Sequence, residues 1–254
     1  MTKLSAVIIT KNEAHIIANT LQSLAGITDN IVIVDNGSTD NTINICQQFN
    51  AHIICTDWKG YGETKNIGID AAKYDWILGI DADEVIDEEL KKAILQIDFS
   101  EEKNIFEMKF KNFFCNKWIR FGEWSGDKHI RLFNRKQVRW NNAAVHESLI
   151  FPVDTKKVSL KKGSILHYTT NSFDEHVEKT IRYAKQNAEK YFKQGKKANI
   201  VKLYLSPFFT FIKYYIFKLG FLDGWYGFLI AKNTAWYTYL KYKFLKEMII
   251  KQNK

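Results

Sequence analysis

Two carboxylates placed two residues apart, Asp81 and Asp83, are the side chains of this sequence best suited to chemistry. They follow a short apolar run, residues 76–80, whose length and composition favour a buried strand. The chain turns at the end of a strand, so both carboxylates can face one point. Oxygen ligands that face one point suit Mg²⁺ or Mn²⁺, with a substrate phosphate completing the coordination. A solvated acidic turn is the alternative, but the position at a strand end favours a metal site.

Strands and helices alternate along the first part of the chain. Apolar runs predict strands at residues 4–10, 31–34, 52–55 and 76–80. Helical patterns lie between these strands. The first runs from residue 16 to a stop at Gly26, the second ends at about residue 49, and the third covers residues 64–72. Asn12 is predicted to cap the first helix, and Asp87 the helix at 88–97. This order is typical of an α/β fold with a mostly parallel sheet, right-handed crossovers and helices on both faces. Such sheets bind ligands at the carboxyl ends of their strands.

The pattern changes after residue 97. Short strand-like segments recur, and we expect them to add mixed or antiparallel strands to the sheet at residues 105–111, 130–133, 138–140, 145–150 and 164–167. Ser172 and Glu175 form a capping box, which predicts a helix that runs from there to Gly195.

Composition narrows the environment and the partners. The net charge of +9 indicates an anionic partner such as a phosphate, a nucleotide, an acidic lipid or a nucleic acid. Three cysteines without a C-x-x-C motif predict free thiols in a reducing compartment. The first apolar run is short and has no cleavage site, so a strand is expected rather than a signal peptide. No window approaches the ~18 apolar residues of a spanning helix. A cytoplasmic location follows as the default.

Residues 196–254 differ in character from the rest of the chain. They are rich in lysine and aromatic residues and nearly free of acids. Ser206 and Pro207 suit a helix start. Basic, aromatic, amphipathic helices lie in the plane of an anionic membrane surface. Packing on the preceding domain and a homodimer face are the alternatives. We therefore predict two domains, residues 1–195 and a helical extension at 196–254.

Three segments together carry a resemblance to a known family. Residues 7–13 (VIITKNE), 32–40 (VIVDNGSTD) and 81–83 (DAD) resemble inverting glycosyltransferases of family 2, which have the GT-A fold. Residues 10–13 (TKNE), 131–133 (RLF) and 145–147 (VHE) resemble the branch of lipopolysaccharide-core β-1,4-glucosyltransferases. The resemblance covers about residues 3–190. The Q-x-x-R-W element of processive synthases is absent, which argues against a polymer synthase.

The resemblance implies a role for each matching residue. Asp35 is expected to bind the nucleotide base while it also caps its own turn, and Glu13 is expected to reach the base or ribose. The nucleotide-sugar site would also include Thr10, Asn12, Lys65, Asp81 and Arg131, with Lys65 near the diphosphate and Asp81 near the ribose or metal. Asp83 would coordinate the metal directly.

The reaction also requires a general base that accepts the proton of the attacking hydroxyl. Glu147 is the first candidate and Asp127 the second. His146 and His167 are weaker candidates, as outer ligands or phosphate contacts.

These inferences predict an enzyme that moves a hexose, expected to be glucose, from a nucleotide-sugar to a lipid-linked saccharide acceptor. The resemblance implies a uridine-diphosphate donor, a lipopolysaccharide-core acceptor, Mn²⁺ or Mg²⁺, and inversion of configuration. The site would lie at the inner face of a bacterial membrane. A polyprenyl-phosphate hexosyltransferase is one alternative. A non-catalytic membrane-binding or nucleic-acid-binding protein is another, but acids at the sheet edge would repel a nucleic-acid backbone.

Overall fold

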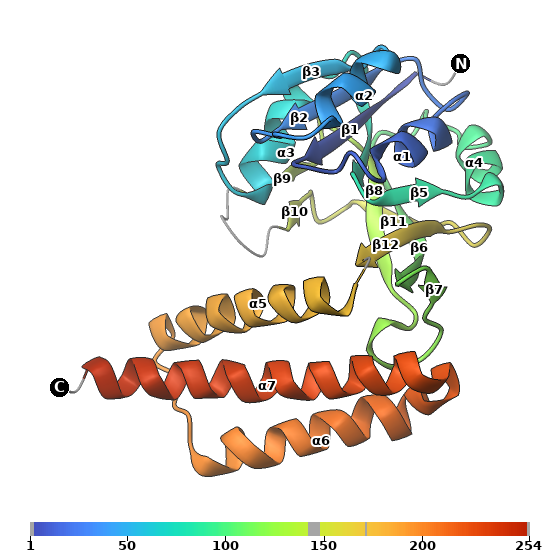
Figure 1. Ribbon diagram of the computed structural model, residues 1–254. Coiled ribbons are helices and arrows are strands. Elements are labelled where there is room, and N and C mark those ends of the chain that lie inside the picture. The colour runs from blue at the N-terminus through green and yellow to red at the C-terminus, as the bar shows by residue number, and fades with distance from the viewer. Residues whose placement is uncertain (1–2, 142–147, 171, 253–254) are drawn as a thin grey trace. The chain divides into compact units, whose positions relative to one another are not determined.

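The computed structural model describes residues 3–141, 148–170 and 172–252 (Figure 1). The chain forms two compact units: unit 1 is Met1–Phe110 with Asp127–His167, and unit 2 is Lys111–Gly126 with Tyr168–Lys254. The predicted division after residue 195 differs from these units, because the helix that precedes it belongs to unit 2. Whether residues 1–195 fold as a separate domain stays a prediction.

Unit 1 begins with the predicted alternation of strands and helices. The parallel strands have the order β3-β2-β1-β4, with bounds β1 (Leu4–Thr10), β2 (Ile31–Asp35), β3 (His52–Cys55) and β4 (Trp76–Asp81). The helices between them are α1 (Ile17–Ser23), α2 (Thr42–Gln48) and α3 (Tyr61–Asp70). The predicted mostly parallel α/β arrangement is therefore confirmed for this part of the chain.

The later strands extend this sheet. β8 (Lys128–Asn134) pairs antiparallel with β4, and the order then continues through β6 (Asn104–Phe114) and β12 (Ile165–Thr170) to β5 (Glu84–Ile86). β11 (Lys156–Ser159) pairs with β6. β9 (Arg139–Trp140) and β10 (Leu149–Ile150) form a separate two-stranded sheet. The predicted additions at 105–111, 130–133 and 164–167 are confirmed, the strand predicted at 138–140 does not join the main sheet, and β5 and β11 were not expected. The predicted strand at 145–150 falls partly outside the described residues.

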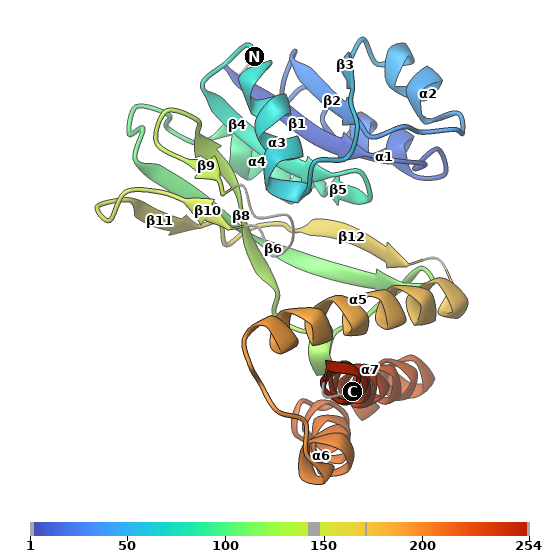
Figure 2. The same cartoon turned by 90° about the vertical axis from the view of Figure 1, so that its left-hand side faces the viewer.

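Both faces of the parallel strands are covered. Leu4 and Ile8 of β1 pack with Leu21 of α1, in a core that also contains residues of α4 (Glu88–Leu95). The intervening Val7 packs with Ile69 of α3 on the other face. Figure 2 views the unit with α3 in front of the strands. Successive side chains of a strand point to opposite faces, so an unbroken apolar run can fill two cores.

The two helix caps predicted in unit 1 have different outcomes. The Asp87 carboxylate accepts the backbone N–H of Leu90 at 2.9 Å, so this residue caps α4 as predicted. Asn12 does not cap α1, which begins at Ile17 without a side-chain cap. The backbone of Asn12 instead adopts a φ of 57°, and its side-chain oxygen accepts the N–H of Thr39 at 2.7 Å. The turn after β2 thus competes successfully for this side chain.

Unit 2 is mainly helical. Its long helices are α5 (Phe173–Lys193), which Ser172 caps as predicted, and α7 (Gly224–Gln252). α6 (Ser206–Ile212) is flanked by π-helical turns η2 (Val201–Leu205) and η3 (Lys213–Phe217), and the short helix η4 (Gly220–Asp223) follows. α5 and α6 both pack on α7 (Figure 1).

Two short elements complete unit 2, β7 (Lys117–Trp118) and η1 (Gly122–Trp124). α6 begins at Ser206 with Pro207 in its first turn, as predicted, although helical backbone already precedes it. Pro207 lacks the N–H that would close an ordinary turn, so a π-helical turn precedes it. No described helix combines the length and the apolar composition that a bilayer-spanning segment requires.

Candidate active site

The carboxyl ends of β2, β1 and β4 form one edge of the sheet in unit 1. Thr10 lies beside Asp35 in the register of β1 and β2, and Ile9 lies beside Asp81 in the register of β1 and β4. Three of the predicted site residues, Thr10, Asp35 and Asp81, therefore lie at neighbouring positions on this edge. This arrangement follows from the parallel topology that the sequence predicts.

Asp35 organises the turn that follows β2. Its carboxylate is buried, and one oxygen accepts the backbone N–H groups of Gly37 at 3.0 Å and Ser38 at 2.9 Å. The hydroxyl of Ser38 donates to the other oxygen. The predicted capping role of Asp35 is thus confirmed, while its contact with a nucleotide base stays a prediction.

The loop after β1 is held by the loop after β2. The N–H of Asn12 donates to the hydroxyl of Ser38 at 2.9 Å, and the N–H of Glu13 donates to the hydroxyl of Thr42 at 2.8 Å. The hydroxyl of Thr10 is buried and has no hydrogen-bond partner among the described residues. These contacts place Thr10, Asn12 and Glu13 at the sheet edge, where a ligand could engage them.

Asp81 lies between two cationic side chains. Its Oδ1 is 3.3 Å from Nζ of Lys65 on α3, and its Oδ2 accepts Nη2 of Arg131 on β8 at 2.9 Å. The same guanidinium donates to the carboxylate of Glu84, which also accepts the backbone N–H of Asp81 at 3.1 Å. Glu84 and Arg131 are buried, with side chains 1% and 10% exposed. The charged groups therefore position one another.

This proximity shifts the pKa values of the group in opposite directions. Burial alone raises the pKa of Asp81, but Lys65 and Arg131 outweigh it, so the pKa lies below its ordinary value. Burial raises the pKa of Glu84 to about 7, although Arg131 opposes the shift. The two carboxylates raise the pKa of Arg131 despite burial. Asp81 is therefore the more fully ionised of the two carboxylates at neutral pH, and it contacts both cations.

Asp83 faces a histidine rather than these cations. β5 pairs antiparallel with β12, which sets His167 opposite Glu84. Nε2 of His167 is 3.4 Å from Oδ2 of Asp83, and both side chains are about a quarter exposed. Burial acts to lower the pKa of His167, but the Asp83 carboxylate and, to a smaller extent, the Glu84 carboxylate outweigh burial and raise this pKa. A carboxylate oxygen suits Mn²⁺ or Mg²⁺, and the imidazole nitrogen can act as a second ligand once it has lost its proton.

The described residues supply only part of a metal's coordination. Among them, no group of three or more His, Cys, Asp or Glu side chains is arranged to hold an ion. Asp83 and His167 offer two ligands, and a Mg²⁺-type site commonly takes its remaining ligands from substrate phosphates and water. The residues thus fit a cation that arrives with a diphosphate. Shared coordination by Asp81 and Asp83 stays a prediction.

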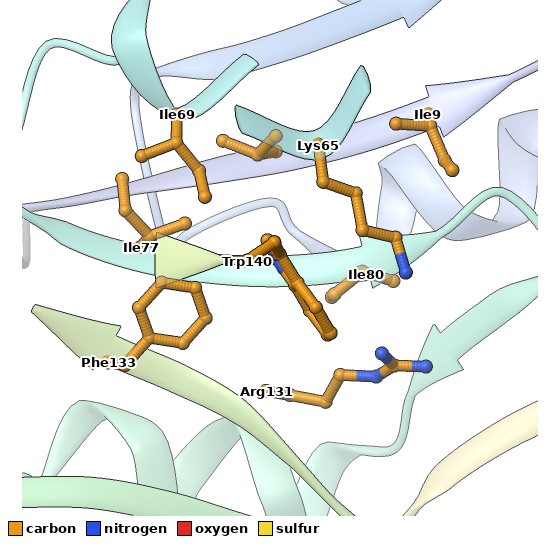
Figure 3. Close-up of a pocket in the computed structure, with 10 residues that line it drawn as sticks. Ile9, Lys65, Ile69, Ile77, Ile80, Arg131, Phe133 and Trp140 are labelled. Atoms are coloured by element: carbon orange, nitrogen blue, oxygen red, sulfur yellow. The ribbon is translucent and has the colours of Figure 1, made fainter. Parts of the chain in front are cut away.

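A small pocket adjoins Lys65 and Arg131 (Figure 3). Its walls are mostly apolar, and the side chains of Lys65 and Arg131 end on the same side of it. Nζ of Lys65 lies 4.6 Å from the centre of the Trp140 ring. Asn66 holds the Trp140 backbone, because its side chain donates to the carbonyl at 2.9 Å and accepts the N–H at 3.2 Å. Trp140 therefore orients Lys65 by a cation–π contact.

The two candidates for the general base have different outcomes. Glu147 and the neighbouring His146 lie outside the described residues, so both assignments stay predictions. Asp127 precedes β8, and its carbonyl accepts the N–H of Phe110 at 2.9 Å. Burial lowers the pKa of His129, although the Asp127 carboxylate acts to raise it.

Sequence reasoning missed two members of the site and ranked a third too low. Glu84 and Trp140 are not among the residues that the sequence patterns single out. His167 was judged a weak candidate. The short strand β5 brings Glu84 and His167 together, and three residues give too little pattern for a strand to be predicted.

A sheet that gathers acidic and basic side chains at the carboxyl edge of its parallel strands is typical of nucleotide-binding α/β enzymes. The chain belongs to glycosyl transferase family 2, since the model of that family matches residues 5–151. Its fold is accordingly GT-A-like, and the protein is a glycosyltransferase. The predictions of fold class, family and enzyme are confirmed.

Individual proteins are similar to this chain over most of its length. An uncharacterized glycosyltransferase of Rickettsia prowazekii, RP128, is 31% identical over 260 residues, covering 99% of this chain and 89% of the relative. The lipopolysaccharide core biosynthesis glycosyltransferase LpsC of Rhizobium meliloti is 25% identical over 93% of this chain and 89% of the relative. The crystal structure of S. aureus TarS 1-349 is 16% identical, covers 100% of this chain and 92% of that chain, and has a TM-score of 0.47.

Proposed function

We propose that the protein is an inverting, metal-dependent hexosyltransferase that acts on a lipid-linked saccharide. The donor would be a uridine-diphosphate hexose, expected to be glucose, and the acceptor a lipopolysaccharide core or a similar glycolipid. Family membership supports the reaction class. The name of the Rhizobium meliloti relative, which is similar over 93% of this chain, supports the acceptor class. The enzyme would work at the inner face of the plasma membrane.

One observation carries the proposal. Asp81 holds the cations of Lys65 and Arg131 at the carboxyl end of β4, next to the pair formed by Asp83 and His167. A nucleoside diphosphate carries concentrated negative charge and needs such cations when it binds and when it leaves.

Each charged side chain then has a separate task. Arg131 and Lys65 would bind the diphosphate, and Asp81 would keep both cations in place when no donor is bound. Asp83 and His167 are the residues that would hold Mn²⁺ or Mg²⁺, which supplies charge neutralisation to the departing diphosphate. Asp35, Glu13, Thr10 and Asn12 would contact the base and ribose at the sheet edge.

At the anomeric carbon, the reaction forms one bond and breaks one. The acceptor hydroxyl oxygen attacks the anomeric carbon from the face opposite the diphosphate, and the carbon–oxygen bond to the diphosphate breaks. The leaving nucleoside diphosphate takes the bonding electron pair, and the hydroxyl proton passes to a carboxylate. Glu147 is the proposed acceptor of this proton, with Asp127 as the alternative. Attack from the opposite face inverts the anomeric configuration.

A donor screen tests this proposal. Binding and hydrolysis of nucleotide-sugars are measured with Mn²⁺, with Mg²⁺ and with a chelator. The anomeric configuration of a transferred sugar is then read by NMR. We expect a uridine-diphosphate hexose to be selected in the presence of a divalent cation, and an α-linked donor to give a β-linked product. A retained configuration, or full transfer with the chelator, would contradict the mechanism.

The acceptor is tested separately. Lipopolysaccharide core from a truncated strain and a polyprenyl phosphate are offered with the selected donor. Transfer to the saccharide supports the proposal. Transfer to the polyprenyl phosphate alone would establish the alternative acceptor class.

A further inference from the structure

One face of the α6 region of unit 2 is apolar and uncovered. Val201, Tyr204, Leu205, Phe208, Phe209 and Ile216 recur at spacings of one, three, four and seven residues along η2, α6 and η3, and their exposed fractions range from 44% to 62%. Helical spacing of this kind gathers side chains on one face. We call these six residues the apolar ridge.

Most of the ridge is not the face by which α6 packs in unit 2, although the ring of Tyr204 at its start lies 6.3 Å from that of Tyr239 on α7. Leu203 is buried, and the ring of Phe211 lies edge-on to Phe228 of α7 at 6.0 Å. The segment is therefore apolar both where it contacts α7 and where it faces away. Contiguous exposed apolar surface is uncommon on a monomeric soluble protein and marks a surface that binds something.

Positive charge accompanies the ridge. Residues 196–222 contain five lysines and no acidic residue. Lys196 precedes the ridge, and Lys213 and Lys218 lie at its other end, all three exposed. The first acid that follows, Asp223, is buried, and its carboxylate accepts the backbone N–H of Arg120 at 3.0 Å. The surface thus combines apolar contact area with cations that no acid of the segment neutralises.

We propose that the apolar ridge docks the protein on an anionic bilayer surface. Apolar side chains would enter the boundary between head groups and acyl chains, while the lysines contact anionic head groups. A second copy of the chain fits less well, because pairing two ridges would bring lysines against lysines. The purpose of docking rests on the proposed function, since a lipid-linked acceptor is held in the membrane.

The test measures binding of the full chain to vesicles. Vesicles of phosphatidylcholine are prepared with and without phosphatidylglycerol, and bound protein is collected by flotation. We expect binding only to the anionic vesicles. Phe208→Glu combined with Phe209→Glu should lower the partition coefficient by about tenfold or more. Ile181→Glu combined with Tyr183→Glu is the matched control, since it adds the same charge at exposed positions on α5 and should bind far better.

A second variant distinguishes a loss of docking from a folding defect in the phenylalanine variant. Lys213→Gln combined with Lys218→Gln leaves the ridge intact and should weaken binding to anionic vesicles only. Unchanged vesicle binding by both the phenylalanine and the lysine variants would overturn the proposal. A concentration-dependent dimer in sedimentation, broken by the phenylalanine variant in a protein that binds no vesicles, would also overturn it.

The docking proposal and the proposed function fail in different ways. Hydrolysis of the nucleotide-sugar in solution does not need a membrane, so the phenylalanine variant should keep it while losing vesicle binding. Normal vesicle binding by a protein without any sugar transfer would contradict the proposed function and leave docking supported. Transfer by a protein that ignores anionic vesicles would contradict docking alone.

Discussion

Glu84 provides a sharp test of the electrostatics of the site. Its side chain is 1% exposed, it accepts the guanidinium of Arg131, and it also accepts the N–H of Asp81. One guanidinium serves two carboxylates, and Asp81 has Lys65 in addition. Burial therefore raises the pKa of Glu84 from 4.5 to about 7. Glu84→Gln keeps the shape of the side chain and removes its titration.

The size and sign of the effect follow from this pKa. Because the folded-state pKa is above the unfolded value, the proton on Glu84 stabilises the folded protein. This stabilisation is fully present below the unfolded pKa of 4.5 and is lost as the pH rises through about 7. The shift corresponds to roughly 3 kcal/mol of unfolding free energy. The pKa of Asp81 is lowered, so its contribution is lost only as the pH falls below its ordinary range.

The assay is urea unfolding followed by tryptophan fluorescence across this pH range. Between about pH 5 and pH 8, the wild type should lose roughly 2 kcal/mol relative to Glu84→Gln. The raised pKa of His167 also lowers stability as the pH rises, but it does so in both proteins. Glu102→Gln changes an exposed glutamate and should follow the wild type. Parallel pH curves for the wild type and Glu84→Gln would refute the reasoning.

The remaining predictions concern catalysis and the buried ion pairs. Glu147→Gln should lower kcat by about a hundredfold or more while UDP binding is kept, and Asp127→Asn should change kcat little; the reverse ranking would assign the base to Asp127. Arg131→Met leaves two carboxylates without their guanidinium, so unfolding free energy should fall by roughly 3–5 kcal/mol in urea titrations. A loss below about 1 kcal/mol would show that the pairs are weakly coupled.

The first half of the fold was predictable because its signals are local. Each parallel strand is one apolar run, and right-handed crossovers then place Asp35 and Asp81 at one edge. The contact between Glu84 and Arg131 was not predictable, since it joins residues 47 apart through strand pairing. His167 reaches Asp83 by the same kind of pairing. Periodicity along a chain carries no information on such partners.

One local pattern, the helix cap predicted at Asn12, failed because a neighbouring segment competes for the side chain. Asn12 has the residue type of a helix cap, yet the turn after β2 binds its side chain. Ser206 and Pro207 have the signature of a helix start, and α6 does begin at Ser206, directly after a π-helical turn that the pattern did not indicate. A tertiary contact can therefore overrule a local signal, as at Asn12, while the signal at Ser206 holds.

The central claim is that Asp83 holds the cation that accompanies the donor diphosphate. Sugar transfer and Mn²⁺-dependent binding of UDP are measured for Asp83→Ala, with Asp154→Ala as the control, because Asp154 lies in an exposed pair with Lys103. Asp83→Ala should lose both transfer and the Mn²⁺-dependent part of UDP binding, and Asp154→Ala should keep both. Undiminished, metal-dependent transfer by Asp83→Ala would contradict the claim.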